Sequence, residues 1–236
     1  MRLDKFLCDM GFGTRSQIKK EIRAGLVMVN DQSCKKPEEQ IDAAKDKVVY
    51  QGKPCVYEAH VYYMLHKPAG VITATSDSRQ KTVMDLMGEV ARPDLFPVGR
   101  LDKDTEGLLL ITNDGALSHN LLSPAKHVPK TYECHLADSF TDEQKAALEH
   151  GVDIGEKKPA KPATVKILAD RKILLTITEG KFHQVKRMLH AVGNEVVYLK
   201  RLQMGSLVLD QSLAKGGYRK LTDEEIMKLY GESGNI

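Results

Sequence analysis

The chain has 236 residues, of which 42% are hydrophobic and 28% are charged, so it can bury a core and is neither disordered nor fibrous by composition. This length fits one or two domains, and no apolar run approaches the roughly 20 residues that a membrane helix needs. Charges within residues 1–5 argue against a secretion signal. The four cysteines form no C-x-x-C pair, which argues against a zinc site or a disulfide framework. We therefore expect a cytoplasmic protein with no membrane association and no bound metal.

The net charge of +3 is unevenly distributed along the chain. Residues 1–36 carry eight Lys and Arg against four Asp and Glu, whereas the remaining 200 residues balance to −1. A small basic head on a nearly neutral body is typical of a module that binds a polyanion. A basic surface that is merely solvated is the alternative, and charge alone does not separate the two.

The basic head reads as two short helices and a strand. Apolar residues recur at helical spacing over residues 3–10, which predicts the first helix. Thr14 and Gln17 have the spacing of a capping box, which predicts a second helix that ends at Gly25. Residues 26–29 then read as a strand that enters a turn.

The head also resembles a known family. R-L-D-K-F-L, followed by T-R-S-Q-x-K-K-x-I-R-A-G-x-V-x-V-N, is similar to the S4 RNA-binding domain. That family uses the basic face of its second helix against RNA phosphates, and such contacts give affinity rather than sequence specificity. The resemblance implies that the RNA-binding residues here are Arg15, Lys19, Lys20 and Arg23.

A domain boundary is expected near residues 57–61, where longer apolar segments separated by glycine-rich turns begin. We predict strands over residues 61–65, 71–75, 108–112, 173–177 and 195–209, and helices near 115–122, 141–150, 183–192 and 222–230. Thr141 with Gln144, and Thr222 with Glu225, repeat the capping-box spacing. Strands and helices do not alternate regularly, so we expect an α+β fold in which a small α/β module precedes a mixed, largely antiparallel sheet flanked by helices.

Residues 98–115, V-G-R-L-D-K-D-T-E-G-L-L-L-I-T-N-D-G, carry the strongest chemical signal. On an extended segment, residues two apart share a face, so Arg100 and Asp102 can point into one cleft. An isolated R-x-D pair would more simply be a surface ion pair. The whole string, however, resembles the signature of the pseudouridine synthases, in the branch typified by the small-subunit ribosomal enzyme. In that family the matching aspartate, Asp102, is the catalytic nucleophile.

Three further stretches resemble the same family. H-K-P-A-G-V at 66–71 is similar to its first motif, which we interpret as a strand-ending turn with a phosphate contact from Lys67. K-T-Y at 130–132 is similar to an element whose tyrosine, here Tyr132, lies against the target uracil; a half-buried core aromatic is the alternative. G-K-F-H-Q-V-K-R-M-L at 180–189 is similar to the third motif, which places a cation, here Lys186, beside the aspartate. Many relatives have arginine there.

The resemblance implies an isomerase that breaks the N1–C1′ bond of uridine, turns the base and rejoins it through C5, without a cofactor. Asp102 would attack the sugar or stabilise positive charge on it, and both routes stay open. Tyr132 would stack on the uracil and assist loss of the C5 proton. The base must leave the RNA stack, and Arg100 would fill the vacated space or bind a flanking phosphate.

We therefore expect an S4-like RNA-binding domain at residues 1–60, a catalytic domain at 61–231 and a tail at 232–236. The resemblance is strongest to the enzyme for one site of 16S ribosomal RNA, so we expect a monomer that acts on 16S rRNA or on a small-subunit assembly intermediate. A 23S rRNA site is the closest alternative. A non-catalytic rRNA-binding assembly factor and a glycosidase-like hydrolase are further hypotheses. The hydrolase would need a second carboxylate, and Asp104 and Glu106 are expected to be solvated.

Overall fold

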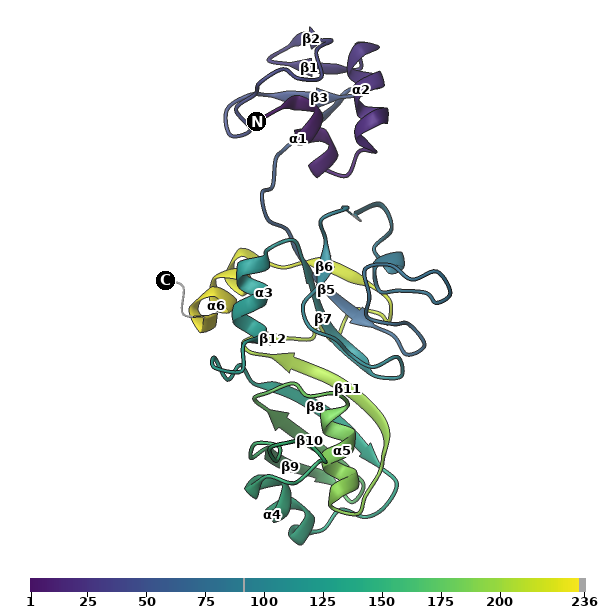
Figure 1. Ribbon diagram of the computed structural model, residues 1–236, viewed down its shortest axis with the longest axis vertical. Helices are drawn as coiled ribbons and strands as arrows, with labels where there is room; N and C mark the ends of the chain where they lie inside the picture. Colours follow the sequence, from purple (N-terminus) through teal and green to yellow (C-terminus); the bar gives the residue numbers. More distant parts are fainter. Residues whose placement is uncertain (91, 234–236) are drawn as a thin grey trace. The chain divides into compact units, whose positions relative to one another are not determined.

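The structure is a computed structural model in which residues 1–90 and 92–233 are described (Figure 1). The chain divides into two compact units. The N-terminal unit comprises Met1–Val61 together with Met87–Leu95, and the C-terminal unit comprises Tyr62–Leu86 and the chain from Phe96 onwards. Nothing in the sequence pattern indicated that residues 87–95 belong with the N-terminal unit.

The N-terminal unit packs two helices on a four-stranded antiparallel sheet with strand order β2-β1-β3-β4. Its elements are α1 (Leu3–Asp9), α2 (Arg15–Arg23), β1 (Val27–Val29), β2 (Gln32–Cys34), β3 (Val48–Tyr50) and β4 (Lys53–Cys55). The predicted capping box is present, because the Thr14 side chain accepts from the Gln17 backbone N–H and the Gln17 side chain accepts from the Thr14 N–H. Ile18 and Ile22 of α2 are buried in the core of this unit.

In its described residues, the C-terminal unit is built on a nine-stranded sheet with the order β13-β5-β7-β11-β8-β10-β9, with β6 beside β7 and β12 beside β11. The strands are β5 (Tyr62–Lys67), β6 (Phe96–Pro97), β7 (Glu106–Thr112), β8 (Lys130–Leu136), β9 (Thr164–Ala169), β10 (Lys172–Ile177), β11 (Val196–Met204), β12 (Leu207–Val208) and β13 (Tyr218–Lys220). Strands β7 and β11 pair in parallel and the other described strand pairs are antiparallel. The prediction of a mixed, largely antiparallel sheet is therefore confirmed.

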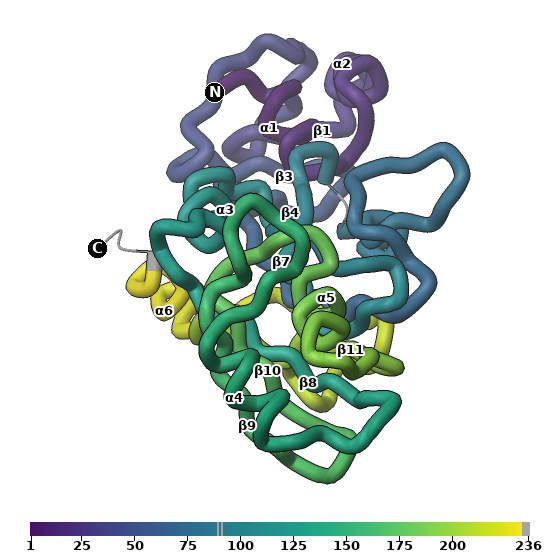
Figure 2. The backbone as a smooth tube through the Cα atoms, turned by 60° about the horizontal axis from the view of Figure 1, so that its bottom comes forward, coloured from purple at the N-terminus to yellow at the C-terminus, as the bar shows by residue number. Residues whose placement is uncertain are grey.

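The helices that flank this sheet are α3 (Gly115–Leu122), α4 (Asp142–His150), α5 (Gln184–Ala191) and α6 (Asp223–Ser233). A short 3₁₀ turn lies at Met84–Leu86 in this unit, and another lies at Gly88–Val90, in the segment that belongs to the N-terminal unit. Helices α3 and α6 lie side by side (Figure 1), whereas α4 packs against β9 and α5 against β11 (Figure 2). Helix α6 continues to Ser233, two residues into the expected tail, and residues 234–236 lie outside the described residues. Among the described residues, no helix is long and apolar enough to cross a membrane.

The two capping boxes predicted in this unit are confirmed, and a further helix is capped by an aspartate. Asp114 caps α3 by accepting from the Leu117 backbone N–H at 3.0 Å. Thr141 and Gln144 form a reciprocal capping box at α4. Thr222 and Glu225 make the same reciprocal pair at α6.

The strand prediction for this unit was wrong at 71–75, and it missed several strands, among them β6, β8, β9 and β13. Among the described residues, 71–75 do not form a strand, and this segment makes only an isolated bridge between Ile72 and Thr82. Instead, the Thr73 hydroxyl forms hydrogen bonds with the backbone of Leu101. Strand β8 was not predicted, although its burial alternates regularly, because the buried face carries the charged side chain of Lys130.

The loop between β6 and β7, residues 98–105, contains Asp102 and is held by a buried lysine. Lys67 is 0% exposed, and its Nζ donates to the carbonyl oxygens of Asp102, Thr105, Lys103 and Pro68 at 2.9, 2.8, 3.3 and 3.1 Å. Burial lowers the pKa of Lys67 to about 8, against the pull of nearby carboxylates. The prediction that Lys67 contacts a phosphate is wrong, because its ammonium is buried and already donates to backbone carbonyl oxygens.

Further contacts hold the same loop. The Thr73 hydroxyl donates to the Leu101 carbonyl at 2.8 Å and accepts from its N–H at 3.2 Å. The Gly70 N–H donates to the Lys103 carbonyl at 2.8 Å. The motif at 66–73 is thus the support on which the Asp102 loop rests.

Gly107 permits the close approach of the parallel strands β7 and β11 directly after this loop. It has a φ of +107°, and a Cβ atom there would lie 2.2 Å from the carbonyl oxygen and 2.7 Å from the nitrogen of Arg201. Backbone atoms of a central strand cannot move aside as a flexible side chain can. Only glycine therefore allows β7 to begin beside β11.

We expect Gly107→Ala to lower the free energy of unfolding by about 3 kcal/mol or more, through both the clash and the backbone strain. Gly115→Ala is the matched control, because no atom lies within 4 Å of its Cβ position. Equilibrium urea denaturation of the two variants checks this. Equal stabilities would contradict the steric argument.

We expect Lys67→Met to destabilise the protein by about 3 kcal/mol or more, because the variant keeps the volume but leaves buried carbonyls without a donor. Lys103→Met, an exposed lysine of the same loop, should change stability by less than about 0.5 kcal/mol. Both are measured by urea denaturation. A Lys67→Met variant as stable as the control would refute the role of the buried ammonium.

Candidate active site

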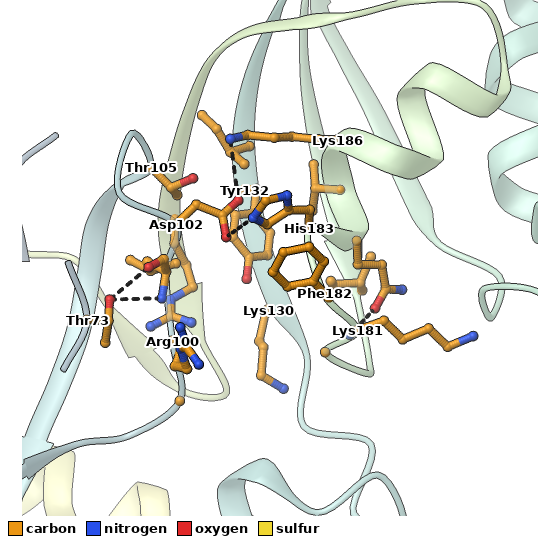
Figure 3. Close-up of a pocket in the computed structure, with 18 of the residues that line it drawn as sticks. Thr73, Arg100, Asp102, Thr105, Lys130, Tyr132, Lys181, Phe182, His183 and Lys186 are labelled. Carbon is orange, nitrogen blue, oxygen red and sulfur yellow. Dashed lines mark hydrogen bonds and ion pairs between the residues drawn. The ribbon is translucent and has the colours of Figure 1, made fainter. Parts of the chain in front are cut away.

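A pocket of about 600 Å³ opens in the C-terminal unit beside the Asp102 loop (Figure 3). Most of its lining comes from three parts of the chain: the loop at 99–105, the neighbouring strands β8 and β11, and residues 180–186 around the start of α5. Ile72, Thr73, Leu122 and Ile177 complete the lining. The sheet supplies the floor, since Lys130 and Tyr132 come from β8 and Arg201 comes from β11.

Asp102 faces two basic side chains across this pocket. Its Oδ2 lies 3.4 Å from the Lys186 Nζ, and its Oδ1 lies 3.4 Å from the His183 Nε2 (Figure 3). The Asp102 side chain is 25% exposed, so it is accessible from the pocket without facing bulk solvent. Both distances exceed the length of an optimal charged hydrogen bond, about 2.7–2.9 Å. The carboxylate therefore keeps capacity for a substrate atom.

Lys186 binds a second carboxylate more closely. Its Nζ donates to the two carboxylate oxygens of Asp104 at 2.6 and 2.8 Å. This hydrogen bond lowers the pKa of Asp104 despite the opposing effect of burial. Asp104 is exposed, as expected, but it is paired and it fixes the ammonium beside Asp102. The compact ammonium of lysine, with three donors, can serve both carboxylates at once.

Glu106 does not lie in the solvated loop where we expected it. It is the first residue of β7 and is 6% exposed. Its carboxylate accepts from the Tyr198 hydroxyl at 2.8 Å and lies 2.7 Å from the Lys215 Nζ. Burial raises the pKa of Glu106, but these two hydrogen bonds outweigh it and leave the pKa lowered. Glu106 thus anchors the end of the Asp102 loop.

His183 lies beside Asp102, although the sequence patterns did not indicate a place for it in the site. It occupies the N-cap position of α5 in the left-handed conformation, with a φ of 49°, and its ring stacks on Phe182 at a centroid distance of 3.8 Å. His183 and Lys186 are three residues apart at the start of a helix, and this spacing indicates that both side chains lie on the same helix face.

Tyr132 and Arg100 complete the predicted set. Tyr132 is buried at 8% exposure, and its ring lies in the pocket next to Asp102 (Figure 3). Arg100 lines the same pocket and is exposed. It forms no hydrogen bond or ion pair with its guanidinium in the described part of the chain. The structure therefore brings Asp102, Tyr132, Lys186 and Arg100 together, and their roles stay predictions.

The predicted basic face of the N-terminal unit is organised by a buried carboxylate. Asp4 is 0% exposed and lies 2.8 Å from the Arg2 Nη2, 3.5 Å from the Arg15 Nε and 4.0 Å from the Lys19 Nζ. The hydrogen bond from Arg2 lowers the pKa of Asp4 against the effect of burial. No pattern in the sequence indicated this role of Asp4. Lys20 and Arg23 of α2 are exposed.

Family models match both parts of the chain. An "RNA pseudouridylate synthase" model matches residues 61–191, and an "S4 domain" model matches residues 1–48. A crystal structure of a pseudouridylate synthase superposes with a TM-score of 0.69 and 42% sequence identity, and the match covers 97% of this chain and 99% of that one.

Whole-length relatives carry the same description. The "uncharacterized RNA pseudouridine synthase YtzG" of Bacillus subtilis is 52% identical, covering 96% of this chain and 97% of the relative. "Ribosomal small subunit pseudouridine synthase A" of Haemophilus influenzae is 42% identical, covering 97% and 99%. The Escherichia coli protein of that name is 40% identical, covering 96% and 98%. The chain therefore belongs to the RNA pseudouridine synthase family, as an isomerase that acts on RNA and carries an N-terminal S4 domain.

Proposed function

We propose that this enzyme converts one uridine of 16S ribosomal RNA into pseudouridine, with Asp102 as the nucleophile. The observation that carries the chemistry is the half-enclosed Asp102 carboxylate, which faces a cation and an aromatic ring in one pocket. The choice of small-subunit RNA is supported by relatives named for that subunit, which are 40–42% identical along nearly their full length. A 23S rRNA site is the alternative.

The geometry suits a reaction at the sugar carbon of an everted nucleotide. The pocket of about 600 Å³ lies in the range of about 300–1,000 Å³ typical of small-ligand sites. A base inside a helix cannot reach it, so the uridine must leave the stack. The Asp102 carboxylate then meets C1′ and either bonds to it or balances its positive charge as the N1–C1′ bond breaks.

The surrounding residues have separate tasks in this proposal. Lys186 places a positive charge 3.4 Å from the Asp102 carboxylate, and the pairing of Lys186 with Asp104 keeps that cation in place. Tyr132 supports the plane of the uracil by stacking and assists loss of the C5 proton. Arg100, exposed at the pocket and unpaired in the described residues, fills the space that the base vacates or binds a flanking phosphate.

The N-terminal unit supplies affinity in this proposal. We assign RNA binding to residues 1–60 and catalysis to residues 61–231, and we place the RNA grip on Arg15, Lys19, Lys20 and Arg23. Contacts of such residues with phosphates raise affinity without reading sequence. We further propose a monomer that works in the cytoplasm on rRNA or on a partly assembled small subunit. The four free cysteines fit a reducing compartment.

We expect Asp102→Asn to retain RNA binding but to lower the single-turnover rate of pseudouridine formation by at least about 10³-fold, as removal of a nucleophile does. Asp170→Asn, at an exposed position, is the control. Filter binding and pseudouridine yield are measured on 16S and 23S rRNA fragments. An active Asp102→Asn variant would remove Asp102 as nucleophile, and a preference for 23S fragments would overturn the choice of substrate.

We expect alanine at Arg15, Lys19 and Lys20 together to weaken RNA binding and to flatten its dependence on salt, by a slope of about 0.7–0.9 for each lost phosphate contact. The rate at saturating RNA should not change. A control with alanine at Lys45, Lys47 and Lys53 removes the same charge from the same unit outside α2. Binding titrations from low to high salt compare the two, and identical slopes would reject α2 as the RNA grip.

A further inference from the structure

Two buried cations on the pocket floor have no part in the chemistry described so far. Lys130 of β8 is 7% exposed and Arg201 of the neighbouring strand β11 is 2% exposed, and both line the pocket that contains Asp102. Neither forms an ion pair with a carboxylate in the described part of the chain. Their positive charges are therefore buried without a counter-charge.

The hydrogen bonds of these two side chains are incomplete. The Lys130 Nζ donates to one backbone carbonyl, that of Val128, at 3.0 Å, although an ammonium has three protons. The Arg201 Nε donates to the Leu108 carbonyl at 2.8 Å, but its Nη2 is buried without a partner. The Thr105 hydroxyl, on the wall of the same pocket, is also buried and unpartnered.

Such an arrangement is costly in the empty protein. A buried polar or charged group without a partner loses its hydration and gains nothing in return. The cost is visible at Lys130, where burial and the neighbouring Arg201 lower the pKa to about 8. Lys67 is equally buried, but several carbonyl oxygens satisfy its ammonium. Unbalanced charges that persist in a pocket point to an anionic ligand.

Lys130 lies apart from Asp102 within the pocket. In Figure 3, Lys130 extends on the opposite side of Tyr132 from Asp102 and Lys186. The pocket is thus polarised, with a carboxylate at one end of the tyrosine and a cation at the other. When the N1–C1′ bond breaks, both electrons stay on the uracil, and the negative charge spreads over its ring nitrogens and carbonyl oxygens. The sugar carbon becomes positive and is balanced by Asp102.

We propose that Lys130 and Arg201 form an anion site that binds the carbonyl oxygens of the detached uracil and stabilises its negative charge until the base rejoins the sugar. This inference rests on the proposed function, in which Asp102 acts on C1′. The N1–C1′ bond breaks with both electrons on N1, and C5 of the anion then supplies the electron pair of the new C5–C1′ bond. Where Asp102 has bonded to C1′, that C1′–O bond breaks at the same time and its electrons return to the carboxylate. The C5 proton leaves to a base, and N1 takes up a proton. Fixed charges that meet developing charge contribute strongly to catalysis.

We expect Lys130→Met, which keeps the length and removes the charge, to lower the single-turnover rate at saturating RNA by about 10²-fold or more. RNA binding should stay within about twofold, because the cations meet only the reacting base. Lys200→Met is the matched control, since Lys200 is next to Arg201 on β11 and faces the other side of the sheet.

A change of leaving group separates charge stabilisation from a structural role. 5-Fluorouracil is a more acidic base than uracil and needs less help to carry negative charge. The fold-loss of rate caused by Lys130→Met should therefore be at least about tenfold smaller on RNA with 5-fluorouridine at the target than on RNA with uridine there. The readout is disappearance of the N1-linked nucleoside after nuclease digestion. Equal losses on the two substrates would overturn the proposal.

A binding measurement on the wild-type protein covers the case in which Lys130→Met fails to fold. Barbiturate, a pyrimidine that is anionic at neutral pH, should bind at least about tenfold more tightly than neutral uracil in calorimetric titrations. Asp102→Asn should bind barbiturate at least as tightly as the wild type does. The binding result can therefore be interpreted even if Asp102 is not the nucleophile. Equal affinity of the wild type for barbiturate and uracil would overturn the anion site.

Discussion

The buried ammonium of Lys67 is the contact on which the geometry of the site depends. It replaces its hydration with backbone carbonyls of the loop that follows β6, including the carbonyl of Asp102 itself. A loop of this kind has few hydrogen bonds of its own, so its shape must be imposed from outside. The ammonium draws the loop towards the end of β5, and Gly107 lets the chain continue directly into β7 against β11. The Asp102 carboxylate is consequently presented to the pocket by a fixed backbone.

From this fixed point the charges of the pocket divide into two groups. Around Asp102 the cations are balanced, because Lys186 is shared between two carboxylates. On the floor the cations of Lys130 and Arg201 are unbalanced, and the described residues offer them carbonyl oxygens alone. Cleavage of a bond between a sugar and a base creates one positive and one negative centre. In the proposed mechanism, a site with the Asp102 carboxylate on one side of Tyr132 and the Lys130 cation on the other is complementary to that separated pair rather than to the intact uridine.

Local patterns in the sequence predicted the helices and their caps well, because a pair such as Thr14 and Gln17 determines its own hydrogen bonds. The grouping of Asp102, Tyr132 and Lys186 came from the resemblance of whole motifs, since these residues lie on three separate elements. Neither local patterns nor motif resemblance predicted that Lys67 supports the Asp102 loop, or the role that we propose for Lys130. A lysine on the buried face of a strand interrupts the apolar alternation, as in β8, and its acceptors lie up to 38 residues away in the case of Lys67. Only the assembled sheet shows which cation is satisfied by the backbone and which is not.

We propose that this pocket acts on one uridine of 16S ribosomal RNA. The most direct measurement is a map of pseudouridines in all ribosomal RNA from cells that lack the protein, compared with the same cells after the intact gene is restored. The account predicts that a single pseudouridine disappears from 16S rRNA and returns on restoration. An unchanged 16S map, or a loss confined to 23S rRNA, would contradict it.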